Sequence, residues 1–416
     1  MSGATHDVVV VGAGPAGATT ATLLARAGLT VALVDRARFP RDKTCGDGLT
    51  TLALRELDSL GLDPGRVASW TPVPVAHLHS PGGRHVKLPL PEGPGQYAAI
   101  ARRIDLDAEL VEMAASAGAE VREEWPLSDA TQSTHGVSVS GPTGSEPIRA
   151  RWIVAADGVW SPTRKALGLA EHRYRGEWHA FRQYRTTTAA AASELHVWFE
   201  RDLLPGYVWS FPLPDGRANV GFGVLRGDSL DGGALARLWP EILARPHIAA
   251  VLGSDSEAEG PHRAWPIPAR VDRALLGAGR VLFTGDAARA TDVFTGEGIG
   301  QALLTGRLAA ATITDDPDGD PLTLVDRYTS AVRHELVADH RMAAGLSRLV
   351  STSPVAEASI AIVGLTGWTR RNVARWLFED SPRGIALTPS RWRKGALSGP
   401  GAFTGETHTR NAASLP

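Results

Sequence analysis

The first 36 residues constrain the fold more than any other part of the chain, because they combine two apolar runs with a regular glycine spacing. The segment "DVVVVGAGPAGATTATLLARAGLTVALVDR" (7–36) predicts a strand, an Ala- and Leu-rich helix and a second strand. Four consecutive valines are typical of a parallel strand that is buried on both faces. A strand–helix–strand unit of this kind predicts a Rossmann-like α/β domain.

The glycines of this segment stand where a dinucleotide-binding turn needs them. Gly12 permits the tight turn, Gly14 lets the backbone approach a pyrophosphate, and Gly17 allows close packing of helix on strand. The pyrophosphate would lie at the helix N-terminus, where free N–H groups favour an anion. An acid at the end of the second strand can accept hydrogen bonds from ribose hydroxyls. We therefore predict a bound dinucleotide with contacts from Gly12, Gly14, Ala16, Gly17, Asp35 and Arg36.

Two later segments, "RARWIVAADGVWSPTRKALG" (149–168) and "AGRVLFTGDAARATDVFTGEGIG" (278–300), each predict an apolar strand followed by an Asp-containing loop. With the first segment, they resemble the three nucleotide fingerprints of the glutathione-reductase-like flavoproteins of the aromatic-hydroxylase type. This resemblance implies a non-covalent FAD. "RIDLDAEL" (103–110) matches the segment whose arginine lies near the flavin, and "TGEGIG" would direct its N–H groups at the isoalloxazine C2 carbonyl. The further cofactor contacts implied are Arg103, Asp157, Gly285, Asp286, Gly296, Gly298 and Ile299.

The chain contains a single G-x-G-x-x-G unit, so no permanent nicotinamide domain is expected. The flavin would be reduced by NAD(P)H or another external electron donor that binds transiently.

The only cysteine, Cys45, lies in "FPRDKTCGDGLT" (39–50), just after the second strand. This segment and "PGYVWSFP" (205–212) resemble two motifs of the geranylgeranyl reductase family, and the resemblance covers about 390 residues. One departure is Asp292-Val293, where family members often carry Asn-Pro before Thr-Gly-Glu-Gly. Because that loop lies near the flavin, the departure bears on the substrate more than on the cofactor.

The resemblance implies a reductase that saturates C=C bonds of a prenyl chain on a lipid or quinone, by hydride transfer from reduced flavin. Cys45, Tyr207 and Trp209 are then the catalytic candidates, and Phe211 joins them in binding substrate. The three aromatics alternate along a strand and therefore share one face. The pattern alone favours ordinary sheet packing for these aromatics and a buried filler role for Cys45, and the family resemblance reverses that preference. A monooxygenase that hydroxylates or epoxidises a small hydrophobic metabolite is the alternative function.

The motif positions predict the organisation of the chain. Residues 1–72, 96–170 and 264–315 would form the FAD-binding domain, 73–95 and 171–263 an inserted antiparallel β-sheet domain for substrate, 316–397 a C-terminal helical region and 398–416 a disordered tail. The arginine- and tryptophan-rich helix after residue 363 fits either an amphipathic cover for the core or a membrane-docking surface. The residues considered for docking are Trp368, Arg370, Arg371, Arg375, Trp376, Trp392 and Lys394.

Composition excludes several other classes of function. A net charge of −2 gives no support to nucleic-acid binding. One cysteine forms no intramolecular disulfide and indicates a reducing compartment, and with no evident signal peptide we expect a cytoplasmic protein, with peripheral contact at the inner face of the membrane left open. The histidines (His172, His179, His196 and His262 among them) show no metal-ligand spacing, so no metal site is predicted.

Overall fold

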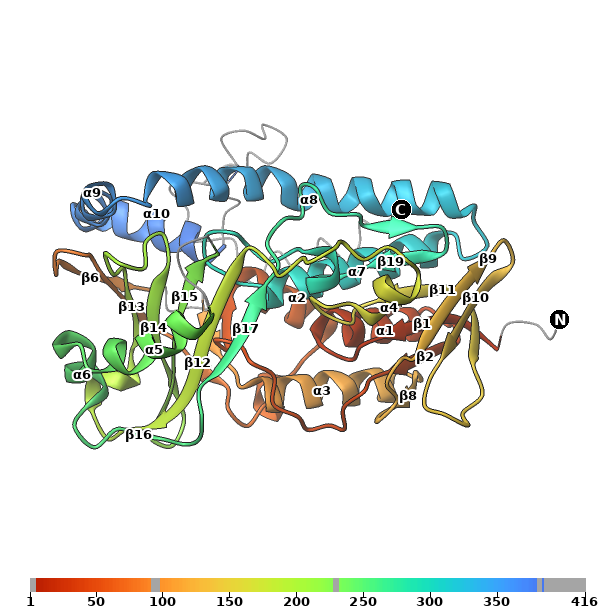
Figure 1. The fold of residues 1–416 in the computed structure, drawn as a ribbon, viewed down its shortest axis with the longest axis horizontal. Helices are drawn as coiled ribbons and strands as arrows, with labels where there is room; N and C mark the ends of the chain where they lie inside the picture. The colour runs from red at the N-terminus through yellow and green to blue at the C-terminus, as the bar shows by residue number, and fades with distance from the viewer. Residues whose placement is uncertain (1–4, 91–97, 227–231, 380–383, 385–416) are drawn as a thin grey trace.

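The structure is a computed structural model that describes residues 5–90, 98–226, 232–379 and residue 384 (Figure 1). One sheet contains the strands β1 (His6–Val11), β2 (Val31–Val34), β8 (Glu120–Arg122), β9 (Asp129–Ser133), β10 (Gly136–Ser140), β11 (Ile148–Ala155), β18 (Gly277–Ala278) and β19 (Val281–Phe283). Its order is β18-β19-β11-β1-β2-β8, with β9 and β10 added to β11 as an antiparallel hairpin. The pairs that join β19, β11, β1, β2 and β8 are parallel, so the Rossmann-like prediction is confirmed.

Helices cover this sheet and bury its valines. Helix α1 (Pro15–Arg26) connects β1 to β2 and packs against α3 (Arg103–Ser116) and α7 (Ile299–Asp315). The β1 residues Val8, Val9 and Val10 are fully buried, as expected for a strand with both faces covered. Shorter helical elements in this part are α4 (Pro162–Ala166) and the 3₁₀ turn η3 (Gly285–Ala288).

A second large sheet contains β5 (Val75–His79), β6 (His85–Pro89), β12 (Trp178–Thr186), β13 (Leu195–Trp198), β14 (Tyr207–Leu213), β15 (Arg217–Leu225), β16 (Glu257–Ala258) and β17 (Arg263–Ile267). Its order is β16-β12-β15-β14-β13-β5-β6, with β17 paired to β12. The sheet is antiparallel except where β13 pairs in parallel with β5, and that pair joins two segments distant in the chain. β17 extends this sheet to residue 267, beyond the boundary expected at 263.

Smaller elements connect the two sheets. A short sheet of β3 (Gly48–Thr50), β7 (Ala98–Ile100) and β4 (Thr71–Pro72) lies next to α2 (Thr51–Leu60), and the 3₁₀ turn η1 (Pro64–Arg66) follows α2 in the chain. The 3₁₀ turn η2 (Ala190–Ser193) precedes β13, and α5 (Gly232–Leu243) and α6 (Pro246–Leu252) pack beside the second sheet. Pro240 lies inside α5.

The C-terminal part is helical, as predicted. Helix α8 (Pro321–Leu349) runs along the length of the molecule, and α9 (Ser353–Gly364) and α10 (Gly367–Leu377) lie at the end that holds the second sheet (Figure 1). Among the docking residues considered above, Arg375 is buried at 4% exposure and is therefore not on a surface. Trp392, Lys394 and the expected tail 398–416 lie outside the described residues.

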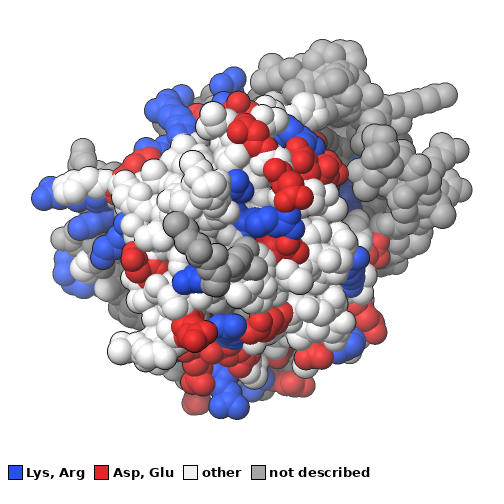
Figure 2. Space-filling model, turned by 90° about the vertical axis from the view of Figure 1, so that its right-hand side faces the viewer, with Lys and Arg blue, Asp and Glu red and all other residues white. Residues whose placement is uncertain are grey.

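Surface charge is mixed. On the end that carries the β9–β10 hairpin, Lys and Arg alternate with Asp and Glu over the described residues and form no single-sign field (Figure 2). Within the described part of the chain, no helix has the length and apolarity that a membrane crossing requires.

Candidate active site

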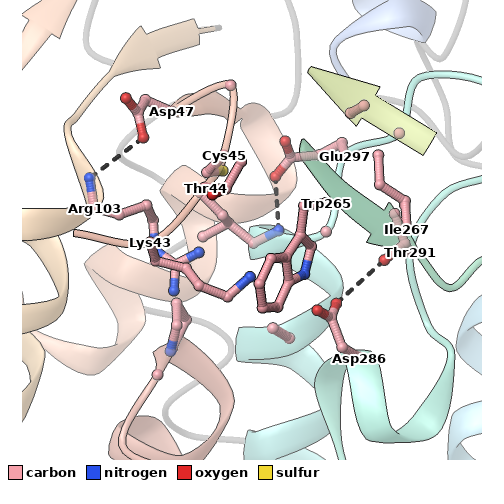
Figure 3. A pocket seen from close by; sticks show the side chains of 18 of the residues that line it. Lys43, Thr44, Cys45, Asp47, Arg103, Trp265, Ile267, Asp286, Thr291 and Glu297 are labelled. Atoms are coloured by element: carbon pink, nitrogen blue, oxygen red, sulfur yellow. Dashed lines mark hydrogen bonds between the residues drawn. The ribbon is translucent and has the colours of Figure 1, made fainter. Parts of the chain in front are cut away.

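A cavity of about 820 Å³ lies between the two large sheets. Its lining comes from the β1–α1 turn, the loop that carries Cys45, the strands β14 and β17, and the start of α7. Figure 3 shows the Cys45 loop together with Trp265 and Ile267 of β17 and with Glu297, just before α7. All of the predicted site residues except Gly17 line it: Gly12, Gly14, Ala16, Asp35, Arg36, Cys45, Arg103, Asp157, Tyr207, Trp209, Phe211, Gly285, Asp286, Gly296, Gly298 and Ile299. Segments far apart in the sequence therefore meet around one space.

The glycines of the β1–α1 turn have different structural roles. A Cβ on Gly12, whose φ is +99°, would lie 2.4 Å from the Ala156 carbonyl oxygen, and one on Gly17 would lie 1.8 Å from the Gly12 oxygen. Both positions therefore exclude a side chain, and Gly17 acts through packing. A Cβ on Gly14 would meet only guanidinium atoms of Arg103 and Arg41, at 3.6 and 3.9 Å. The space in front of Gly14 is thus open and faced by two cations, as a pyrophosphate requires.

Acidic side chains stand around the nucleotide half of the cavity. Asp35 accepts hydrogen bonds from the Ala13 and Ala37 backbone N–H groups, at 2.7 and 2.8 Å, which fixes its carboxylate at the end of β2. Asp157 accepts from the Thr163 N–H through Oδ2, while its buried Oδ1 has no partner. An unpartnered buried oxygen in the cavity wall fits a ligand that donates hydrogen bonds, such as the hydroxyls of FAD.

Arg103 lines the cavity, and Asp107 holds its guanidinium in place. Its guanidinium donates two hydrogen bonds of 2.7 Å to Asp107, which also receives one from Arg41. Because Asp107 is fully buried, these pairs hold both arginines in place. Arg41 and Arg103 together carry one positive charge more than Asp107 neutralises, which favours an anionic ligand beside Gly14.

The start of α7 differs in one respect from the arrangement expected for "TGEGIG". The Ile299 and Gly300 N–H groups donate to Glu297 Oε1, at 2.9 and 3.3 Å, so the first N–H groups of the helix are occupied (Figure 3). Burial, followed by the nearby Glu379, raises the pKa of Glu297 to about 8. Just before "TGEGIG", Asp292 accepts hydrogen bonds from the Phe294 and Thr295 N–H groups. These bonds stabilise the turn at Asp292-Val293, where family members often carry Asn-Pro.

The Cys45 loop is held by the second sheet. Asp47 sits in the left-handed region with φ +64° and is fully buried. Its carboxylate accepts from the Tyr184 hydroxyl on β12 at 2.7 Å and from Asn219 Nδ2 on β15 at 2.8 Å. Asn219 also donates to the Cys45 carbonyl oxygen at 2.9 Å. Arg182 donates to Asp42 and to the Lys43 carbonyl, so sheet side chains fix the whole loop.

Burial determines the protonation of this loop. It raises the pKa of the Cys45 thiol, although the positive charge of Arg103 opposes the rise. It also raises the pKa of Asp47 to about 6 and lowers that of Lys43 to about 8. The Lys43 ammonium lies 3.9 Å from the centre of the Trp265 ring, which offsets part of its desolvation (Figure 3). Cys45 therefore carries its proton at neutral pH.

The aromatic residues of β14 form one wall of the cavity. The ring centres of Tyr207 and Trp209 are 6.0 Å apart, and those of Trp209 and Phe211 are 6.1 Å apart. The Trp209 indole N–H donates to Asn219, and the Tyr207 hydroxyl donates to the Thr295 carbonyl. A Cβ on Gly46 would lie 3.5 Å from the Phe211 ring, so the Cys45 loop packs directly on this wall.

Comparisons with known proteins agree with this geometry. A family model described as FAD binding domain matches residues 5–303. The chain is 35% identical over 344 residues to a menaquinone reductase of Mycolicibacterium smegmatis, covering 77% of this chain and 81% of the relative. It is 30% identical over 354 residues to digeranylgeranylglycerophospholipid reductase 2 of Methanopyrus kandleri, covering 83% and 86%. The chain belongs to the geranylgeranyl reductase family of FAD-dependent oxidoreductases.

A solved structure shows that this family's fold extends over nearly the whole chain. The geranylgeranyl bacteriochlorophyll reductase-like protein of Thermoplasma acidophilum superposes with a TM-score of 0.78 at 20% identity, covering 94% of this chain and all of that one. The family assignment, the fold class and FAD as cofactor, all predicted from sequence, are thus confirmed.

Several residues of the site were not identified from the sequence of this reductase-family chain. Arg182, Tyr184 and Asn219 reach the Cys45 loop from strands more than 130 residues away in the chain. Only Asn219 carries a signal of its own, since it interrupts the largely apolar strand β15, whereas β12 contains several other polar residues that do not distinguish Arg182 and Tyr184. Glu297 lies within a predicted motif, yet its cap on α7 was not foreseen.

Proposed function

We propose that this protein is a reductase that saturates isolated C=C bonds of a prenyl chain carried by a lipid or quinone. The observation that carries the proposal is the continuity of one cavity, which runs from the Gly14 turn past the Cys45 loop to the aromatic wall of β14. One end of it suits a dinucleotide and the other an apolar chain. The names of the two relatives, a menaquinone reductase and a digeranylgeranylglycerophospholipid reductase, support the same substrate class.

FAD, when bound and reduced, supplies the hydride, and the residues of the chain provide what an unactivated alkene additionally needs. The apolar side chains Leu78, Leu195 and Val197 line the cavity together with the β14 aromatics, and exclude water from the reacting bond. Binding by shape alone suits isoprene units, because they offer no hydrogen-bonding group. This wall therefore orients the prenyl chain.

The Cys45 thiol is the group that we assign to proton placement. Burial keeps it protonated, so it can hold a proton at Sγ next to the apolar wall. The positive charge of Arg103 favours the thiolate that would remain after transfer. Asn219 and Asp47 fix the backbone of the loop and thereby the position of Sγ.

We further propose that the substrate enters from a lipid surface at the α9–α10 turn. Ile362, Leu365 and Trp368 are exposed there at 57%, 71% and 52%, and the neighbouring Arg371 is also exposed. This combination of apolar and cationic side chains suits an anionic membrane surface. Helix α10 starts at this turn and ends at Leu377, which lines the cavity, so the surface and the site are connected by one helix.

The electron donor, NAD(P)H or another carrier, is proposed to visit the flavin transiently. Within the described residues, the Rossmann-like sheet that contains β1 provides the glycine-rich turn that holds FAD, and no second such unit is present.

Anaerobic incubation of the reduced holoprotein with a menaquinone and, separately, with a geranylgeranylated glycerophospholipid tests the proposal. Mass spectrometry of the recovered lipid should show two added hydrogens for each saturated bond. Cys45→Ala should retain FAD but slow single-turnover transfer, by about 10²–10⁴-fold if the thiol delivers the proton. Unchanged lipids, together with oxygen consumption coupled to a hydroxylated product in a parallel aerobic incubation, would instead establish the monooxygenase function.

A further inference from the structure

A cluster of histidines lies on the face of the second sheet that points away from the cavity. β5 contributes His77 and His79, β6 contributes His85, and β13 contributes His196. The strand register pairs His196 with His77 and His79 with His85, so alternation along each strand brings the four rings to one face. The cluster was not apparent in the sequence, because the strands that hold it come from two distant segments.

The rings are in direct contact. His77 and His196 stack with centres 4.4 Å apart, and His79 and His85 with centres 4.7 Å apart. Glu194, two residues before His196, reaches back to His77, with 2.7 Å between Oε2 and Nε2. His77 and His196 are each only 5% exposed, whereas the Glu194 side chain is partly open to solvent.

We propose that His77, Glu194 and His196 form a binding site for a late first-row divalent cation such as Zn²⁺. One ligand atom from each residue lies within 4.8 Å of the other two. A tetrahedral zinc site with bonds of about 2.0–2.1 Å separates its ligand atoms by roughly 3.3 Å, so small side-chain rotations complete the geometry. Two imidazoles and a carboxylate form a donor set typical of zinc, with a water as the fourth ligand on the open side of Glu194.

The surroundings of the site prepare the histidines as ligands. His196 Nε2 lies 3.0 Å from the Ala191 carbonyl oxygen, which can only accept, so the lone pair is on Nδ1. In the structure His196 Nδ1 lies 3.1 Å from His79 Nε2, and a cation bound at Nδ1 would replace the hydrogen bond from His79. A backbone carbonyl that orients a histidine in this way is a common outer-shell feature of metal sites. His77 Nδ1 lies 2.7 Å from His85 Nε2, so His77 can keep its proton on Nδ1 while Nε2 binds the cation.

Charge also favours a cation at this place. Glu194 is a partly exposed carboxylate that supplies negative charge beside the two buried imidazoles of His77 and His196.

The position of the site indicates its role. Ala76, Leu78, Leu195 and Val197 of the same strands project to the opposite face and line the cavity. The parallel β13–β5 pair joins two distant chain segments, and a cation held by His77 of β5 and His196 of β13 would clamp that junction. The metal would therefore stiffen one wall of the cavity without touching the cofactor or substrate.

Zinc titration of the untagged, chelator-treated FAD holoprotein tests the proposal. We expect one saturable site by calorimetry, one bound zinc per chain by elemental analysis after desalting, and a melting temperature that rises and saturates with zinc. Glu194→Gln and His196→Gln should each weaken binding by more than the roughly 10–100-fold that outer-shell changes cause. His179→Gln, on β12 of the same sheet and outside the cluster, is the matched control and should bind as wild type.

Glu194→Gln keeps the shape of a partly exposed side chain, so it separates loss of a ligand from misfolding; flavin content and far-UV circular dichroism should match those of wild type. An absence of saturable zinc binding by the wild type would overturn the proposal and leave a hydrogen-bonded histidine cluster that only packs the sheet. Wild-type affinity in both ligand variants would overturn it as well. None of these readouts depends on prenyl reduction, so the result is independent of the proposed function.

Discussion

Removing the Tyr184 hydroxyl tests whether the second sheet holds the Cys45 loop. In the structure this hydroxyl donates a 2.7 Å hydrogen bond to the buried carboxylate of Asp47. The pKa of Asp47 is about 6, so at pH 8 the acceptor is ionised. A hydrogen bond to a charged group contributes about 1.5–3 kcal/mol, and Tyr184→Phe should lower the free energy of unfolding by that amount.

This loss translates into a measurable melting shift. An unfolding entropy of about 2.1 cal/mol/K per residue gives roughly 0.9 kcal/mol/K for 416 residues, so we expect a melting temperature about 2–3 °C below that of wild type. The measurement is differential scanning calorimetry at pH 8 with saturating FAD. Below about pH 5 the carboxyl is protonated, and the shift should shrink because a neutral hydrogen bond contributes only about 0.5–1.5 kcal/mol.

Tyr174→Phe is the matched control. The Tyr174 hydroxyl donates a hydrogen bond of the same length to Glu177, outside the cavity lining. Both variants should lose stability, but only Tyr184→Phe should slow single-turnover reduction of a prenyl substrate, because it alone loosens the loop that positions Cys45. If Tyr184→Phe melted with wild-type stability at pH 8, or if both variants reduced the substrate at the same rate, the loop would not depend on this contact.

Three further predictions concern the cofactor and the loop. Gly14→Leu should yield colourless protein, because its side chain would fill the open space in front of the Arg103 guanidinium; a wild-type flavin-to-protein absorbance ratio would show that the pyrophosphate binds elsewhere. Asp35→Ala should weaken FAD binding by about 1.5–3 kcal/mol in a flavin titration, since it removes an ionised acceptor at the end of β2; unchanged affinity would remove this residue from the site. Because burial raises the pKa of Asp47 from 3.8 to about 6, its contribution to stability is fully present below the lower value and is lost as the pH rises through the higher one. Relative to Asp47→Asn, the wild type should therefore lose about 2–2.5 kcal/mol of unfolding free energy between about pH 4 and 7, as measured by urea denaturation, and a pH-independent difference would contradict the assigned pKa.

The sequence was sufficient for the nucleotide half of the molecule, because its constraints are local. Backbone contact at Gly12 and Gly17 leaves no room for a side chain, so the chain must show glycine at these positions whatever surrounds them. Alternation on a strand likewise placed Tyr207, Trp209 and Phe211 on one face before any tertiary contact was known. Strand alternation and glycine spacing depend only on neighbouring residues, so both can be recognised in the sequence of a short segment.

Only the tertiary structure could decide what meets those segments. Arg182 and Asn219 hold the Cys45 loop because strand register carries them to it, and register depends on the packing of the whole sheet. His77 and His196 become neighbours through the parallel β13–β5 pair, although more than a hundred residues separate them in the chain. The sequence around a polar side chain does not identify its distant hydrogen-bond partner, since that partner depends on how the strands and sheets pack against each other. For the same reason, the sequence predicted no metal site, whereas the folded sheet places two imidazoles and a carboxylate within reach of one cation.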